Sequence, residues 1–233
     1  LKRFSFELGG KAPHIIFADA DVEQALNAAT GSAWALCGQS CALGSRILVE
    51  RPIYDRVVEE FRHRAGLVRV GLPLDPATHM GPQAHQQQLD KTLSYIGIGS
   101  AEGAELVAGG SRLSGGALAD GYFVEPTVFA NVNPGMRIAQ EEIFGPVLAI
   151  QSFRTDDEVI EKANNTPYGL SAGVWTDKGS KIFNLTTKLR AGVIWANTFN
   201  KFDPSSPFGG YKESGYGREG GLHGLLPYLN LFS

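Results

Sequence analysis

The sequence predicts an α/β fold: a mainly parallel, open sheet with helices on both faces, giving a three-layer α/β/α arrangement. Three observations predict it. Short runs rich in β-forming residues alternate with helical patterns along most of the 233 residues, as in chains of strand–helix–strand units. The run Val147-Leu148-Ala149-Ile150 is apolar without a break, which is typical of strands buried on both faces. Hydrophobic residues make up 43% and charged residues 19% of the chain, close to the averages of globular domains.

Strand and helix patterns follow one another from the start. Residues 14–17 are expected to be a strand, and Asp21 suits the N-cap of an Ala- and Leu-rich helix over 22–36. A strand is expected over 45–50, and Pro52 suits the first turn of a helix that runs to residue 65. Further helices are expected over 83–95, 156–163 and 180–189, and extended segments over 122–129, 147–153, 171–176 and 192–197.

The composition excludes several classes of protein. Lys and Arg number 21 against 24 Asp and Glu, whereas a nucleic-acid partner requires a clustered basic excess. No apolar run reaches the roughly 18 residues of a membrane helix, so no membrane span is expected. Two cysteines, Cys37 and Cys41, cannot form a disulfide scaffold and favour a reducing compartment, so we expect a cytoplasmic protein. Glycine, at 29 residues, is in excess, which suggests tight turns or a ligand against bare backbone.

Cys41 is the first candidate for chemistry. Free cysteines are most often buried packing residues, but Cys41 follows Gly38-Gln39-Ser40, a polar segment at a helix-to-strand junction where catalytic groups are commonly displayed. Cys37 and Cys41 are four positions apart and could share a helical face. A metal site would need two more ligands, and the five histidines show no ligand spacing, so no metal is expected.

Two acidic segments and one loop are further candidates. Glu7 precedes Gly9-Gly10, which suits a general base beside closely approached backbone, although a solvated charge is the ordinary alternative. The pair Glu141-Glu142 precedes the buried strand at Val147, and an exposed turn is again the alternative. The polar and aromatic loop that begins at Asn197 follows a predicted strand, where open α/β sheets usually bind ligands.

Gly215-Tyr216-Gly217-Arg218-Glu219-Gly220 matches the dinucleotide pattern G-x-G-x-x-G in its letters. A true fingerprint follows a strand directly and opens a strand–helix–strand unit. Neither condition is met here, so this segment is not expected to bind a dinucleotide.

Taken together, four segments resemble the aldehyde dehydrogenase superfamily. They are Glu7-Leu8-Gly9-Gly10-Lys11, Gly38-Gln39-Ser40-Cys41, Glu142-Ile143-Phe144-Gly145-Pro146 and Pro207-Phe208-Gly209-Gly210-Tyr211-Lys212-Glu213-Ser214-Gly215. The resemblance implies the catalytic-domain fold of that family. It also implies that Cys41 attacks an aldehyde, that hydride leaves to a nicotinamide, and that Glu7 activates water to hydrolyse the resulting thioester.

The same resemblance implies the binding residues. Glu142, Phe144, Gly9, Gln88 and Lys91 would contact NAD or NADP. Asn197, Phe202 and Phe208 would line the substrate tunnel.

The family's N-terminal cofactor domain precedes the Glu7 motif, so residues 1–233 are expected to be one catalytic domain of a longer chain. The 233 residues alone are expected not to oxidise an aldehyde. The full-length enzyme is expected to act on a small-molecule aldehyde and to be a homo-oligomer. Two alternatives stay open: a cofactor-free thiol esterase that uses Cys41 and Glu7, and a non-catalytic structural or interaction module.

Overall fold

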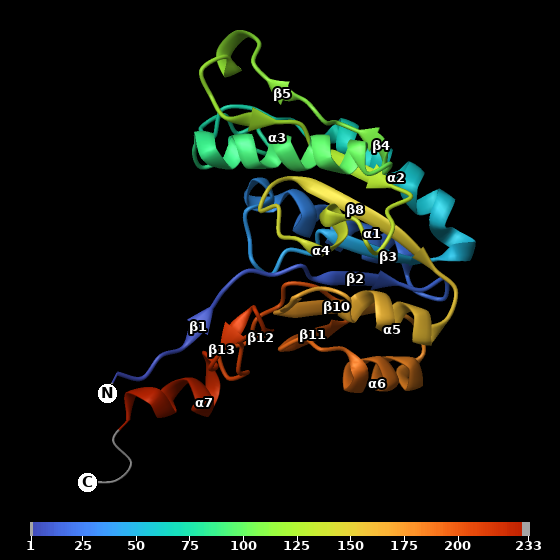
Figure 1. The fold of residues 1–233 in the computed structure, drawn as a ribbon, viewed down its shortest axis with the longest axis vertical. Helices are drawn as coiled ribbons and strands as arrows, with labels where there is room; N and C mark the ends of the chain where they lie inside the picture. The colour runs from blue at the N-terminus through green and yellow to red at the C-terminus, as the bar shows by residue number, and fades with distance from the viewer. Residues whose placement is uncertain (1, 230–233) are drawn as a thin grey trace.

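A seven-stranded sheet forms the centre of the computed structural model, which describes residues 2–229 (Figure 1). Its strand order is β11-β10-β2-β3-β8-β7-β4. Neighbouring strands are parallel except for the pair β4 and β7, which is antiparallel. The bounds are β11 (Val193–Ala196), β10 (Ser171–Trp175), β2 (Pro13–Ile16), β3 (Arg46–Glu50), β8 (Val147–Phe153), β7 (Thr127–Ala130) and β4 (Glu105–Ala108). The expected mainly parallel sheet is therefore confirmed.

Three two-stranded ribbons accompany the sheet. They pair β1 (Phe6–Glu7) with β13 (Gly215–Tyr216), β9 (Tyr168–Gly169) with β12 (Tyr211–Lys212), and β5 (Arg112–Leu113) with β6 (Phe123–Val124). The helices are α1 (Val22–Trp34), α2 (Tyr54–Leu67), α3 (Gln86–Ala101), α4 (Arg137–Gln140), α5 (Asp156–Asn164), α6 (Gly179–Lys188) and α7 (Gly221–Leu225). Short 3₁₀ turns lie at Ala35–Gly38, Arg51–Ile53, Gly116–Leu118 and Leu226–Tyr228. None of the helices in residues 2–229 is long and apolar enough to cross a membrane.

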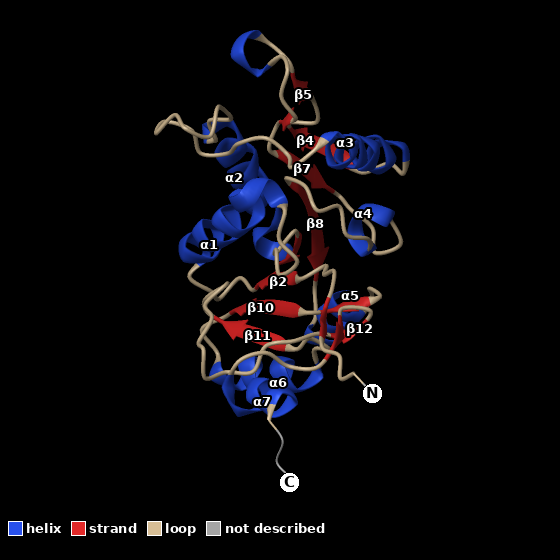
Figure 2. Cartoon of the chain, turned by 90° about the vertical axis from the view of Figure 1, so that its left-hand side faces the viewer, coloured by secondary structure: helices blue, strands red, loops and turns tan. Residues whose placement is uncertain are grey.

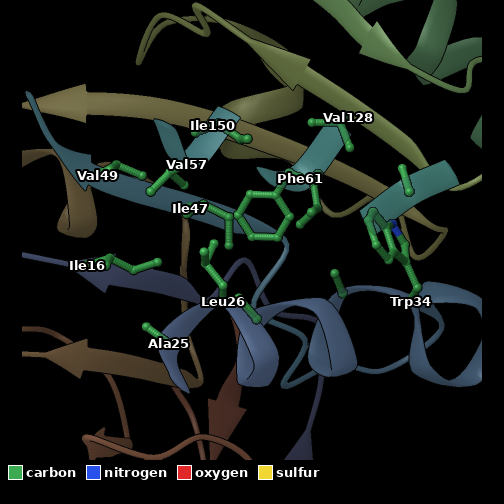
Figure 3. Close-up of a cluster of buried hydrophobic side chains, with 14 of the residues drawn as sticks. Ile16, Ala25, Leu26, Trp34, Ile47, Val49, Val57, Phe61, Val128 and Ile150 are labelled. Atoms are coloured by element: carbon green, nitrogen blue, oxygen red, sulfur yellow. The ribbon is translucent and has the colours of Figure 1, made fainter. Parts of the chain in front are cut away.

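Helices cover both faces of the sheet because successive side chains of each strand point to opposite faces. In β3, Ile47 and Val49 join a buried cluster with α1 and α2, which includes Leu26 and Phe61 (Figure 3). Leu48, between them, joins a cluster with α5 and α6 on the other face. Figure 2 shows α1 and α2 on one side of β8, and α3, α4 and α5 on the other.

Several element boundaries differ from those expected. Helix α1 is capped by Asp21 as predicted, but it ends at Trp34 rather than at residue 36. Leu36 and Cys37 have φ of 50° and 60°, in the left-handed region. The expectation that Cys37 and Cys41 share a helical face is therefore wrong.

Two other segments depart from the prediction for visible reasons. The extended segment over 122–129 is two strands, β6 and β7, separated at Glu125-Pro126, since proline cannot donate to a sheet ladder. Helix α3 begins at Gln86 because the His85 side chain accepts a hydrogen bond from the backbone N–H of Gln88, and it continues to Ala101.

His14 is a titratable side chain in the middle of the sheet. It is fully buried in β2, stacked between Trp175 and Phe199 with ring centroids 5.9 Å and 4.8 Å away. Neither ring nitrogen has a hydrogen-bond partner among the described residues. Burial lowers the pKa of His14 from its usual 6.5 to about 3.

We expect this histidine to make the fold sensitive to acid. The unfolded chain takes up a proton at His14 as the pH falls below 6.5, whereas the folded chain does not until about pH 3. Between these values, each unit by which the pH falls lowers the free energy of unfolding by about 1.4 kcal/mol through His14. His14→Leu should remove this part of the slope in urea melts between pH 7 and pH 4.5. His63→Leu, at an exposed position, is the control, and equal slopes for wild type and His14→Leu would contradict the account.

Candidate active site

Glu7 and Cys41 face the same hollow, which has a volume of about 420 Å³ and is called here the Cys41 hollow. Three stretches far apart in the sequence form its wall. Its lining residues are Glu7, Leu8, Gly9, Leu36, Gln39, Ser40, Cys41, Glu142 and Phe144. The structure thus brings together five of the residues singled out from the sequence: Glu7, Gly9, Cys41, Glu142 and Phe144.

The loop that carries Cys41 is fixed by two glycines. Gly38, with φ of 74°, packs so closely on the backbone of Gly145 and Pro146 that a side chain would overlap it. On the other side, a side chain on Gly10 would overlap the carbonyl oxygen of Cys41. The loop is therefore held between the segment before β8 and the segment after β1, and Cys41 is left half-buried at the hollow.

The Cys41 thiol shares its hollow with the Glu7 carboxylate. Burial, together with the hydrogen bond and the negative charge of Glu7, raises the pKa of Cys41 to about 12. Backbone hydrogen bonds from Ala42 and from Cys41 itself act in the opposite direction, because they stabilise the thiolate. The thiol and the Glu7 carboxylate both line the Cys41 hollow, so they can act on one bound group.

Glu142 is held at the rim by the same glycine pair. The backbone N–H of Gly10 donates a hydrogen bond of 2.8 Å to Oε1 of Glu142. A Cβ on Gly9 would lie 2.7 Å from Oε2 of Glu142, so a side chain there would displace the carboxylate. Phe144, two residues on, has a left-handed φ of 60° and also lines the hollow.

Gln88 and Lys91 do not line the Cys41 hollow. The Gln88 amide donates to the carbonyl oxygen of Ile143 at 3.1 Å, so it supports the segment that carries Phe144. The Lys91 amine lies over the ring of Tyr95, 6.0 Å from its centroid. Both residues lie on α3, behind the wall rather than in it.

The three expected tunnel residues are divided between two places. The Asn197 side chain both donates to and accepts from the backbone of Thr176, at 3.0 Å each, which ties the end of β11 to the end of β10. Phe202 and Phe208 stack edge to face at 5.1 Å. Phe208 also packs against the buried cluster that Cys41 borders.

A second hollow of about 300 Å³ adjoins the first, since Leu36 and Ser40 line both. Its wall contains Ser32 of α1 and Phe199, Asn200 and Lys201 of the loop after β11. Phe199 was not singled out from the sequence, although it lies within the polar and aromatic loop that was. Across residues 2–229, no group of three or more His, Cys, Asp or Glu side chains is placed to hold a metal ion.

The chain is similar to known proteins along nearly its whole length. The sequence profile described as "Aldehyde dehydrogenase family" matches residues 1–232. The chain belongs to the aldehyde dehydrogenase family. Human retinal dehydrogenase 2 is 49% identical over 228 residues, which are 98% of this chain and 43% of the relative. The resemblance carried by the four motifs is thereby confirmed at the level of the family.

Solved aldehyde dehydrogenases share the fold. The NAD+ complex of the aldehyde dehydrogenase from Bacillus cereus has a TM-score of 0.94 and 45% identity, covering 98% of this chain and 46% of that one. Betaine aldehyde dehydrogenase from Staphylococcus aureus, in complex with NAD+, also has a TM-score of 0.94, with 42% identity over 97% of this chain and 45% of that one. The chain spans less than half the length of the relatives it matches.

The geometry makes the two thiols unequal. Cys41 is half-buried at a hollow, whereas Cys37 is only 8% exposed, and burial raises its pKa as well. We expect iodoacetamide to alkylate Cys41 well before Cys37, as followed by peptide mass spectrometry over time. After denaturation the two thiols should react at similar rates, and similar rates in the folded protein would contradict the placement of Cys41.

Proposed function

We propose that this chain supplies the nucleophile and the general base of an NAD(P)-dependent aldehyde dehydrogenase that converts an aldehyde to a carboxylic acid. The observation that carries the proposal is that Glu7 and Cys41 line one hollow. Residues 1–233 act as the catalytic domain, and dehydrogenase activity belongs to a longer, cytoplasmic, homo-oligomeric enzyme. Membership of the family supports the reaction class.

Cys41 performs the first step. Its thiol loses its proton to water, the sulfur attacks the aldehyde carbon to form a C–S bond, and the carbonyl double bond opens so that its oxygen becomes the oxyanion of a thiohemiacetal. The backbone N–H groups of Cys41 and Ala42, which favour the charged form of the sulfur, are the donors available to this developing charge. Preorganised backbone donors of this kind act without reorganisation at the moment of reaction.

The Cys41 hollow fits the reactive end of a nicotinamide nucleotide. Its volume of about 420 Å³ lies within the range of small-molecule sites, and Gly9 presents bare backbone there. Glu142 would face the ribose and Phe144 the ring. When bound, the oxidised nucleotide would supply a hydride acceptor and a positive charge beside the thiol.

The two nearby structures solved with NAD+ support a dinucleotide of this class. We propose that the remainder of the nucleotide is held by parts of the enzyme outside these residues, since the relatives are more than twice as long.

Glu7 performs the hydrolytic step. Its charge raises the pKa of the Cys41 thiol, so the carboxylate does not increase the population of thiolate at rest. An exposed carboxylate beside the sulfur is instead well placed to take a proton from the water that attacks the thioester carbon. The C–S bond then breaks, and the carboxylic acid leaves.

The same pair of groups supports a second candidate, a cofactor-free thiol esterase, because acylation of Cys41 and hydrolysis by Glu7 need no nucleotide. The two candidates differ in one requirement. Only the dehydrogenase reduces NAD(P)+ in proportion to the aldehyde consumed.

The charge arrangement gives Glu7→Gln two opposite effects. Loss of the charge lowers the pKa of Cys41, so alkylation by iodoacetamide at pH 7 should become faster. We expect about threefold for each unit of pKa, since the thiolate fraction rises tenfold while a Brønsted coefficient of about 0.4–0.5 lowers its reactivity. Hydrolysis of a Cys41 acyl-enzyme, formed with an activated ester and followed by mass spectrometry, should slow by about 10²–10⁴-fold. Slower alkylation, or unchanged hydrolysis, would contradict these roles.

The dehydrogenase reaction is tested in the full-length protein. Cys41→Ser should abolish aldehyde-dependent reduction of NAD+ or NADP+, measured by absorbance, whereas Cys37→Ser should retain it. The 233 residues alone should reduce neither nucleotide. Retention of activity by Cys41→Ser would disprove the assignment of the nucleophile.

A further inference from the structure

The strand that carries Glu7 lies outside the seven-stranded sheet. Within residues 2–229, β1 pairs with β13 alone, and it does so through Phe6 with Tyr216 and Glu7 with Gly215 (Figure 1). Both β1 residues are exposed. The place of the Glu7 backbone therefore depends on the hairpin over 211–216 rather than on burial in the core.

Ser214 is the buried residue of this hairpin, and it forms hydrogen bonds to the two residues that follow Glu7, Leu8 and Gly9. Its hydroxyl donates a hydrogen bond of 2.6 Å to the carbonyl oxygen of Gly9. The backbone carbonyl oxygen of Ser214 accepts a hydrogen bond of 3.0 Å from the N–H of Leu8. The Ser214 hydroxyl also accepts a hydrogen bond of 2.9 Å from the N–H of Gly169 in β9. Ser214 thus connects the residues after Glu7 to the body of the molecule.

The hairpin is itself anchored away from β1. Strand β12 pairs with β9, and the Lys212 amine donates to the carbonyl oxygens of Asn164 and Thr166 at 2.9 Å each. Arg218 donates to the carbonyl oxygen of Gly210 at 3.0 Å and lies over the Tyr211 ring. These contacts tie the hairpin to parts of the molecule other than β1.

Two glycines of the 215–220 segment allow the hairpin and the β1 segment to lie close together. Gly215 has φ of 112°, and a side chain there would overlap the carbonyl oxygen of Phe6. Gly217, with φ of 90°, would likewise overlap Ser5. The two glycines let the backbone of the β1 segment lie directly against the hairpin.

We propose that Ser214 is a positioning residue for the general base: through Gly9 and Leu8 it holds the Glu7 carboxylate beside the Cys41 thiol. The proposal rests on the proposed function, in which Glu7 acts at Cys41. A serine suits the position because it is small enough to be fully buried beside Gly210 and carries one hydroxyl that both donates and accepts.

The test is the pH dependence of Cys41 alkylation by iodoacetamide in this chain, for wild type, Ser214→Ala, Glu7→Gln and the double variant. If Ser214 acts through Glu7, Ser214→Ala lowers the apparent pKa of Cys41 in the same direction as Glu7→Gln. Alkylation at pH 7 then rises at least threefold, which corresponds to about one unit of pKa. In the Glu7→Gln background, Ser214→Ala should cause no further shift.

A matched control separates positioning from general destabilisation. Thr155→Ala removes the N-cap of α5, where the threonine hydroxyl accepts from the N–H of Glu158 at 3.2 Å, far along the chain from the site. It should lower the melting temperature without moving the pKa of Cys41. An unshifted pKa in Ser214→Ala, or a shift equal to that in Thr155→Ala, would overturn the proposal.

Hydrogen exchange gives a second test that needs no variant. The amides of Leu8 and Gly169, both bonded to Ser214, should be protected in the wild-type protein, and a Leu8 amide as unprotected as that of Lys2 would overturn the proposal. If Glu7→Gln itself leaves the pKa of Cys41 unchanged, the contact between Glu7 and Cys41 fails. If only Ser214→Ala has no effect, the positioning role fails and the catalytic pair stands.

Discussion

The close approach of three backbone segments is the constraint on which the site depends. Gly10 lies against the carbonyl of Cys41 and Gly38 lies against Gly145, with no room for a side chain at either contact, and Gly9 faces the Glu142 carboxylate. A Cβ at these positions would push apart the loops that carry the nucleophile, the base and the rim. The glycine excess in the sequence is thus used, in part, to bring the reactive groups of distant segments within reach of one another.

The charge of Glu7 affects Cys41 differently before and after the sulfur is acylated. A carboxylate beside a thiol disfavours the thiolate, and burial disfavours it further, so the resting Cys41 is protonated at neutral pH. The low thiolate fraction slows alkylation and oxidation of the resting sulfur, since the thiolate is the reactive form, although Cys41 is still the more accessible of the two thiols. The same carboxylate becomes useful once the sulfur is acylated, because a thioester carries no charge to repel it and needs an activated water.

Much of the architecture could be predicted from sequence because the long elements have strong local signals. The apolar strand β8, the Asp21 cap of α1 and the alternation of strands with helices are encoded within single segments. The end of α1 was not predictable in this way: Leu36 and Cys37 adopt left-handed conformations just before Gly38, which packs on Gly145, more than a hundred residues away. The two-residue ribbons β1–β13 and β9–β12 are too short to show a periodicity. The roles of Asn197 and Phe199 also depend on contacts between distant segments, which no local sequence pattern shows. The Asn197 amide binds the end of a neighbouring strand, and Phe199 lines the second hollow from a loop.

A crystal structure of the chain alkylated at Cys41 by iodoacetamide, with Cys37 replaced by serine, tests the central claim most directly. The account places the added carbamoylmethyl group in the space between the Glu7 carboxylate and the backbone of Gly9, with Glu142 still bonded to the N–H of Gly10. A structure in which the modified sulfur and the Glu7 carboxylate open onto separate surfaces would contradict it.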